Sequence, residues 1–133
     1  VEKLPVIKDV PALINQLFKN LISNSLKFAK EDVAPHITVT CQALAPEQII
    51  NNPALNNQLL YWEIIVKDNG IGFDQHFADQ IFIIFQRLNT RYAGTGIGLT
   101  LCKKIVQYHN GSISAESNDN EGARFVILLP MLK

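Results

Sequence analysis

Two glycine-rich segments have residue types and spacing that could do chemistry. Residues 68–73 (DNGIGF) follow an apolar segment, and glycines one residue apart let the backbone turn sharply and approach a ligand, with Asp68 at the turn. Residues 94–99 (GTGIGL) open a helical pattern, where free backbone N–H groups and the helix dipole suit a phosphate. Taken singly, the first is also typical of a strand-ending turn, and the second of tight helix–sheet packing.

A third set of polar residues lies on a predicted helix that runs from Asp9 to about Phe28. Asp9 and Pro11 are typical of a helix start. One helical face is apolar, and the other carries Gln16, Asn20, Asn24 and Lys27. A solvated face normally carries Glu and Lys, and asparagine is a poor helix former, so two asparagines inside this helix call for a reason other than helix stability.

The surrounding pattern predicts the elements that must position these residues. Period-2 alternation predicts strands at 36–44, 61–67, 112–117 and 123–129, and helical spacing predicts a second long helix from Ile97 to Asn110-Gly111. Residues 45–59 are expected to form a long exposed hairpin loop, and residues 74–85 a short helix. The order predicts an α/β two-layer sandwich, with about three helices on one face of a mixed sheet.

The amino-acid composition excludes several classes of protein. The 133 residues carry 12 basic and 12 acidic side chains and are 47% hydrophobic, which excludes a disordered tail and argues against a general nucleic-acid or membrane-surface binder. The longest nearly unbroken apolar run, residues 125–132, is too short to span a bilayer. Cys41 and Cys102 do not make a disulfide framework and are expected to be buried thiols in the cytoplasm.

Four segments in a fixed order resemble the catalytic ATP-binding domain of sensor histidine kinases. Residues 20–28 (NLISNSLKF) resemble the N box, 68–73 the first glycine box, 81–87 (IFIIFQR) the F box and 94–99 the second glycine box. The resemblance covers about residues 9–130. It implies one GHKL-type domain over residues 1–133, with a lid at about 74–93.

The resemblance also implies roles for individual residues. Asn24 matches a Mg²⁺ ligand, Asp68 the acceptor for the adenine amino group, and Arg87 a side chain that contacts the γ-phosphate. Arg87, Lys27 and Asn20 are the expected catalytic residues, with Lys27 on phosphate. The expected nucleotide-binding set is Asn20, Asn24, Lys27, Phe28, Asp68, Gly70, Ile71, Gly72, Arg87, Gly94, Thr95, Gly96, Ile97, Gly98 and Leu99. For Phe28, packing in the core is an almost equal alternative.

The implied function is transfer of the γ-phosphate of Mg·ATP to a histidine on phosphoacceptor helices absent from this chain, in two-component signalling. Expected partners are those helices and a response regulator, with no nucleic acid or membrane contact, and a monomeric isolated domain. Two alternatives are ATP hydrolysis, as in gyrase-like relatives, and nucleotide sensing without catalysis. Asn20 argues against hydrolysis, because hydrolytic relatives carry a glutamate there and an amide cannot act as a base.

Two positions depart from the family pattern. Ile83-Ile84 replace the usual Glu-Pro of the F box, which bears on lid or partner contacts. Gly122 is followed by Ala123 where the family usually has threonine, so a hydroxyl expected near the adenine is lost.

Overall fold

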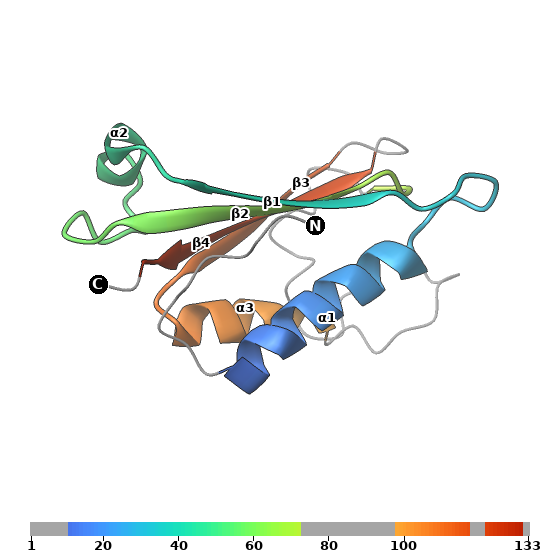
Figure 1. The fold of residues 1–133 in the computed structure, drawn as a ribbon, viewed down its shortest axis with the longest axis horizontal. Coiled ribbons are helices and arrows are strands. Elements are labelled where there is room, and N and C mark those ends of the chain that lie inside the picture. Colours follow the sequence, from blue (N-terminus) through green and yellow to red (C-terminus); the bar gives the residue numbers. More distant parts are fainter. Residues whose placement is uncertain (1–10, 73–97, 118–121, 132–133) are drawn as a thin grey trace.

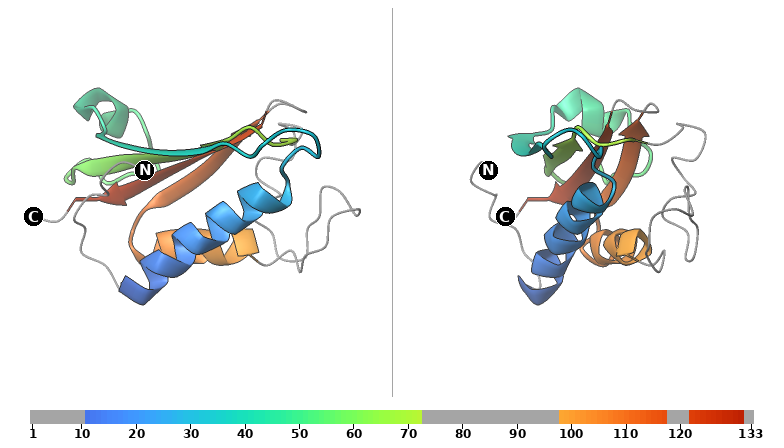
Figure 2. Two further views of the ribbon diagram at one scale, coloured as in Figure 1. Left: turned by 45° about the vertical axis from the view of Figure 1, so that its right-hand side comes forward. Right: turned by 90° about the vertical axis from the view of Figure 1, so that its right-hand side faces the viewer.

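The computed structural model describes residues 11–72, 98–117 and 122–131. A four-stranded sheet carries helices α1 (Pro11–Lys27) and α3 (Gly98–Tyr108) side by side on one face (Figures 1 and 2). None of the helices in these residues is long and apolar enough to cross a membrane. The predicted two-layer α/β architecture is confirmed, whereas the predicted helix within 74–85 lies outside the described residues.

The sheet has the strand order β1-β2-β4-β3, formed by β1 (Ile37–Ala43), β2 (Tyr61–Asp68), β3 (Ser112–Ser117) and β4 (Ala123–Pro130). Every described strand pair is antiparallel, where the sequence predicted a mixed sheet. In the register, Val66 of β2 is paired with Phe125 of β4, and Phe125 with Ala115 of β3. These inner positions face α1 and α3, and the intervening residues face the opposite side.

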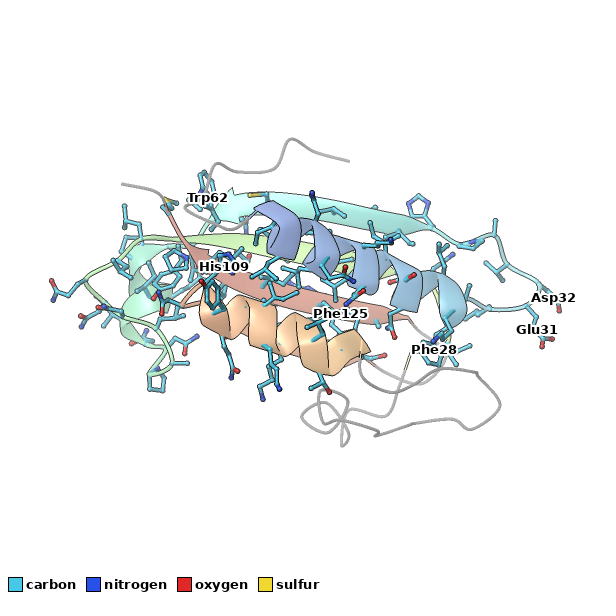
Figure 3. All side chains as sticks on the ribbon, turned by 90° about the horizontal axis from the view of Figure 1, so that it is seen from below. Phe28, Glu31, Asp32, Trp62, His109 and Phe125 are labelled. Atoms are coloured by element: carbon cyan, nitrogen blue, oxygen red, sulfur yellow. The ribbon has the colours of Figure 1, made fainter. Side chains whose placement is uncertain are left out.

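The main core lies between the sheet and the two long helices. Leu17 and Leu21, one helical turn apart on α1, are fully buried, and Phe125 lies between α1 and α3 in Figure 3 with 1% of its surface exposed. The same cluster contains Val39, Ile64, Val66, Cys102, Ile105, Val106, Ala115, Ala123, Ile127 and Leu129. The apolar periodicity of α1 is therefore the packing surface that holds this helix against the sheet.

Residues 45–59, predicted as a long exposed hairpin loop, do connect the antiparallel strands β1 and β2, and most of them are exposed. The prediction missed a short helix and two buried side chains. The helix is α2 (Pro46–Ile50), which lies on the sheet face opposite α1 and α3 (Figures 1 and 2). Ile49 and Leu55 are buried there with Tyr61, because the outer face of the sheet has apolar side chains at this end. The Tyr61 hydroxyl also accepts a hydrogen bond from the Asn56 N–H, at 2.9 Å.

Helix α3 ends at the predicted Asn110-Gly111 pair. Asn110 adopts a left-handed conformation with φ 61°. The Gly111 N–H donates to the Val106 carbonyl at 2.9 Å, and the Asn110 N–H donates to the Gln107 carbonyl at 3.0 Å. This is the Schellman arrangement, which satisfies two of the carbonyls that a helix end leaves unpaired.

The buried stripe of α1 generates a stability prediction. Leu21→Ala should lower the free energy of unfolding by about 2–5 kcal/mol, because it removes a fully buried side chain and leaves a cavity. Leu26→Ala, on the same helix but 53% exposed, should cost less than about 1 kcal/mol. Urea denaturation of both variants measures the difference, and equal losses would contradict this account of the core.

Candidate functional site

The carboxylate of Asp68, at the end of β2, is the centre of the candidate site. Its Oδ1 accepts hydrogen bonds from the Gly70 N–H at 2.9 Å and from the Ala123 N–H at 3.1 Å. Its Oδ2 accepts one from the Ser25 hydroxyl at 2.8 Å. Asp68 is only 8% exposed, so the three donors compensate the loss of water around a buried carboxylate. They come from α1, from the turn after β2 and from the start of β4.

Glycine is required at two positions around this carboxylate for steric reasons. A Cβ at Gly70 would lie 2.5 Å from the carbonyl oxygen of Phe28, which also accepts the Ile71 N–H at 2.9 Å. Gly122 has φ +90°, and a Cβ there would lie 2.2 Å from the backbone oxygen of Asp68. The turn after β2 therefore packs against the end of α1, and the start of β4 packs against the backbone of Asp68.

The C-terminal half of α1 brings the predicted N-box residues to this end of the molecule. Phe28, half-buried, lies just beyond the end of α1 in Figure 3, at the opposite end of the molecule from Trp62. Lys27 is exposed. Asn24 is half-buried, and its side chain makes no hydrogen bond within residues 11–72, 98–117 and 122–131. Its amide oxygen thus suits a hard cation, which prefers oxygen ligands.

No three His, Cys, Asp or Glu side chains gather as a metal-binding group within the part of the chain that the structure describes.

Asn20 connects α1 to α3. Its Oδ1 accepts a hydrogen bond from Gln16 Nε2 at 2.7 Å, and its side chain also bonds to the thiol of Cys102 on α3. The Cys102 Sγ lies 3.8 Å from the carbonyl oxygen of Leu17. Burial raises the pKa of Cys102 to about 12, against the smaller lowering effect of its hydrogen bonds. The Asn20 amide is thus engaged in helix–helix contacts.

The structure brings together one part of the predicted set. In the turn after β2, the Gly70 N–H bonds to Asp68, and the Ile71 N–H bonds to the Phe28 carbonyl, which Gly70 also approaches closely. Gly72 follows with φ 68°. Gly98 begins α3, and Leu99 packs against the main core. The remaining predicted site residues lie outside the described part of the chain. They are Arg87, Gly94, Thr95, Gly96 and Ile97, together with the F box and the lid at about 74–93.

Ser25 is the site residue that the sequence reasoning missed. It follows Leu17 and Leu21 at intervals of four residues, so it lies on the buried stripe of α1, and it is 3% exposed. A hydroxyl at a core-facing helical position needs a partner, and this was the signal that could have identified it.

Solved structures with the same fold are histidine kinase domains. The mycobacterial sensor histidine kinase MprB superposes with a TM-score of 0.75 at 19% identity, covering 93% of this chain and 76% of that one. Full-length ShkA in complex with AMPPNP has a TM-score of 0.71 at 22% identity, covering 96% of this chain and 23% of that one. The fold is thus that of a histidine kinase ATP-binding domain.

Residues 9–133 match the family described as histidine kinase-, DNA gyrase B- and HSP90-like ATPase, and the chain belongs to this family. Cyanobacterial phytochrome A of Nostoc is 42% identical over 132 residues, which cover 98% of this chain and 15% of the relative. The sensor protein kinase WalK of Staphylococcus aureus is 34% identical over 124 residues, covering 90% and 26%. The chain therefore spans a minor part of the length of both relatives.

The two thiols should differ in reactivity. Burial raises the pKa of Cys102 to about 12 and encloses its thiol fully, whereas Cys41, which was expected to be buried, is partly exposed. We expect maleimide to modify Cys41 in the native chain and Cys102 only in urea, as read by peptide mass spectrometry. In Cys41→Ser, the native chain should stay unlabelled, and prompt labelling of Cys102 would contradict its placement.

Proposed function

We propose that this chain binds Mg·ATP and presents the γ-phosphate to a histidine on the phosphoacceptor helices of a sensor kinase. The observation that carries the proposal is the buried Asp68 carboxylate, fixed by donors from three elements beside two glycine-requiring turns. Membership of the ATPase family and the sensor kinases among its relatives support the same reading.

The nature of Asp68 supports adenine as the base. An ionised carboxylate only accepts hydrogen bonds, so it pairs with the exocyclic amino group of adenine and opposes the carbonyl oxygen of guanine. Oδ1 already accepts two backbone N–H groups. Oδ2 is therefore the oxygen that we assign to the base. Phe28 and Ile71 adjoin this point, and we assign them contacts with the nucleotide.

The phosphates and the metal are assigned to the remaining predicted residues. Asn24 would hold Mg²⁺ through its amide oxygen, and the exposed Lys27 would contact phosphate. When bound, the metal neutralises charge on the phosphate oxygens during transfer. We assign Arg87 to the γ-phosphate, and Gly70, Gly72 and the glycines at 94, 96 and 98, with Thr95, Ile97 and Leu99, to the segments that surround the nucleotide.

Asn20 supports transfer over hydrolysis. Its amide cannot take a proton from water, and it is hydrogen-bonded to Gln16 and Cys102. The base for the histidine reaction would then belong to the acceptor domain, and a response regulator would receive the phosphoryl group. Nucleotide sensing without catalysis is the second candidate, and the phosphotransfer test below distinguishes it.

Asp68→Asn tests the assignment of the base. The amide would place an N–H₂ donor where Oδ2 met the amino group of adenine, so Mg·ATP binding should weaken by about 1.5–3 kcal/mol, or about 10- to 150-fold. The preference for ATP over GTP should shrink as well, because the new donor suits the guanine carbonyl. Titration calorimetry measures both affinities. Asp32→Asn, in the exposed loop after α1, is the matched control (Figure 3). Equal affinities for ATP and GTP in the unaltered chain would contradict the assignment.

Asn24→Ala tests the metal and the reaction. With acceptor helices supplied as a separate protein, the unaltered chain should form acid-labile phosphohistidine on them from radiolabelled ATP, and should hydrolyse ATP poorly alone. Asn24→Ala should abolish transfer by removing the metal ligand, while some nucleotide binding through Asp68 remains. Asn15→Ala, exposed on the same helix, should transfer normally. Full transfer by the Asn24 variant, or brisk ATPase activity of the chain alone, would contradict the proposal.

A further inference from the structure

The hydroxyl of Ser25 helps to compensate the burial of Asp68, but it has so far been given no part in ligand recognition. It is 3% exposed, on the apolar stripe of α1, and it donates to Asp68 Oδ2 at 2.8 Å across 43 residues of sequence. An alanine would serve the packing of this stripe without a buried polar atom. The hydroxyl thus makes its hydrogen bond to Asp68 Oδ2, which is the carboxylate oxygen assigned to the ligand.

The two oxygens of Asp68 are held in different ways. Oδ1 is held by two backbone N–H groups, Gly70 and Ala123, which no side-chain change removes. Oδ2 has only the Ser25 side chain among the described residues. The terminal torsion of an aspartate is broad, and Ser25 together with the two backbone donors restricts it.

We propose that Ser25 is a positioning residue for recognition of the adenine base, acting through Asp68. Its hydroxyl occupies one lone pair of Oδ2 and, with the two backbone donors on Oδ1, holds the carboxylate so that the other lone pair of Oδ2 is directed at the exocyclic amino group. This inference rests on the proposed function and adds a specificity-determining residue to it.

The direction of the Ser25 hydrogen bond adds to this discrimination. Because its proton is committed to Asp68, the Ser25 oxygen has only lone pairs left to present. A 6-oxopurine would meet acceptors on both groups, or would have to draw the Ser25 proton away and leave Oδ2 without its donor. Either outcome leaves a buried polar group unpaired, which is how sites built from hydrogen bonds reject a wrong ligand.

Ser25 also accounts for the departure at position 123. The sequence has alanine where a hydroxyl is expected near the base, and the structure shows that the backbone of Ala123 still donates to Oδ1. The hydroxyl beside the carboxylate comes instead from α1. The chain thus keeps a hydroxyl at Asp68 but supplies it from α1.

The experiment compares two nucleotides on matched variants. Mg·ATP and the Mg complex of purine riboside 5′-triphosphate, which lacks the amino group, are titrated calorimetrically into the unaltered chain, Ser25→Ala and Ser23→Ala. Ser23 makes the same change at an exposed position of α1. We expect Ser25→Ala to weaken ATP binding about 5- to 20-fold and purine nucleotide binding less than about 2-fold. Ser23→Ala should change neither.

Two further measurements keep the test independent of folding defects. Ser25→Thr keeps the hydroxyl and should restore most of the ATP preference, whereas the weaker thiol donor of Ser25→Cys should give an intermediate loss. Without nucleotide, the amide protons of Gly70 and Ala123 should exchange faster in Ser25→Ala, because the acceptor that they share is less fixed.

The outcomes separate this inference from the proposed function. If Ser25→Ala loses affinity for both nucleotides equally, or keeps the full ATP preference, the positioning role is wrong and the proposed function stands. If the unaltered chain does not bind Mg·ATP, the proposed function fails and the inference falls with it.

Discussion

The Asp68 carboxylate is the point at which three separate parts of the chain are fastened together. It receives one donor from α1, one from the turn after β2 and one from the first residue of β4. A carboxylate this buried is stable only with its hydrogen bonds made, so the three parts must be in place together. The geometry that a ligand would meet is therefore inseparable from the docking of α1 on the sheet.

Glycine makes this arrangement sterically possible. Gly70 lets the turn after β2 approach the end of α1, and Gly122 lets β4 start against the backbone of Asp68. Both contacts are closer than a Cβ atom would permit, so these two glycines allow one segment of the chain to pack against the backbone of another. The close approach of a phosphate, as proposed above for glycines of this chain, would be a separate reason for glycine.

Helix α1 serves two neighbours with different chemistry. Its leucine stripe is buried against the sheet, while Asn20 and the Leu17 carbonyl contact the Cys102 thiol of α3. Because α3 begins at Gly98, at the end of the second glycine-rich segment, this polar contact connects the two helices that carry the predicted site motifs. The outer cluster around α2 lies on the opposite face of the sheet and leaves this connection untouched (Figure 1).

The sequence by itself determined the elements with strong local signals and the family to which the chain belongs. The α1 periodicity, the alternation of the strands and the Asn110-Gly111 helix end are local, and each was predicted correctly. The burial of Ile49 and Leu55 was missed, because it depends on an apolar outer patch of β2 and β4 that only the assembled sheet creates. The role of Ser25 was missed for the same reason, since its partner is 43 residues away and only tertiary packing brings the two together. Side-chain identity determined what Asp68 can accept, and the fold decided which oxygen is left to accept it.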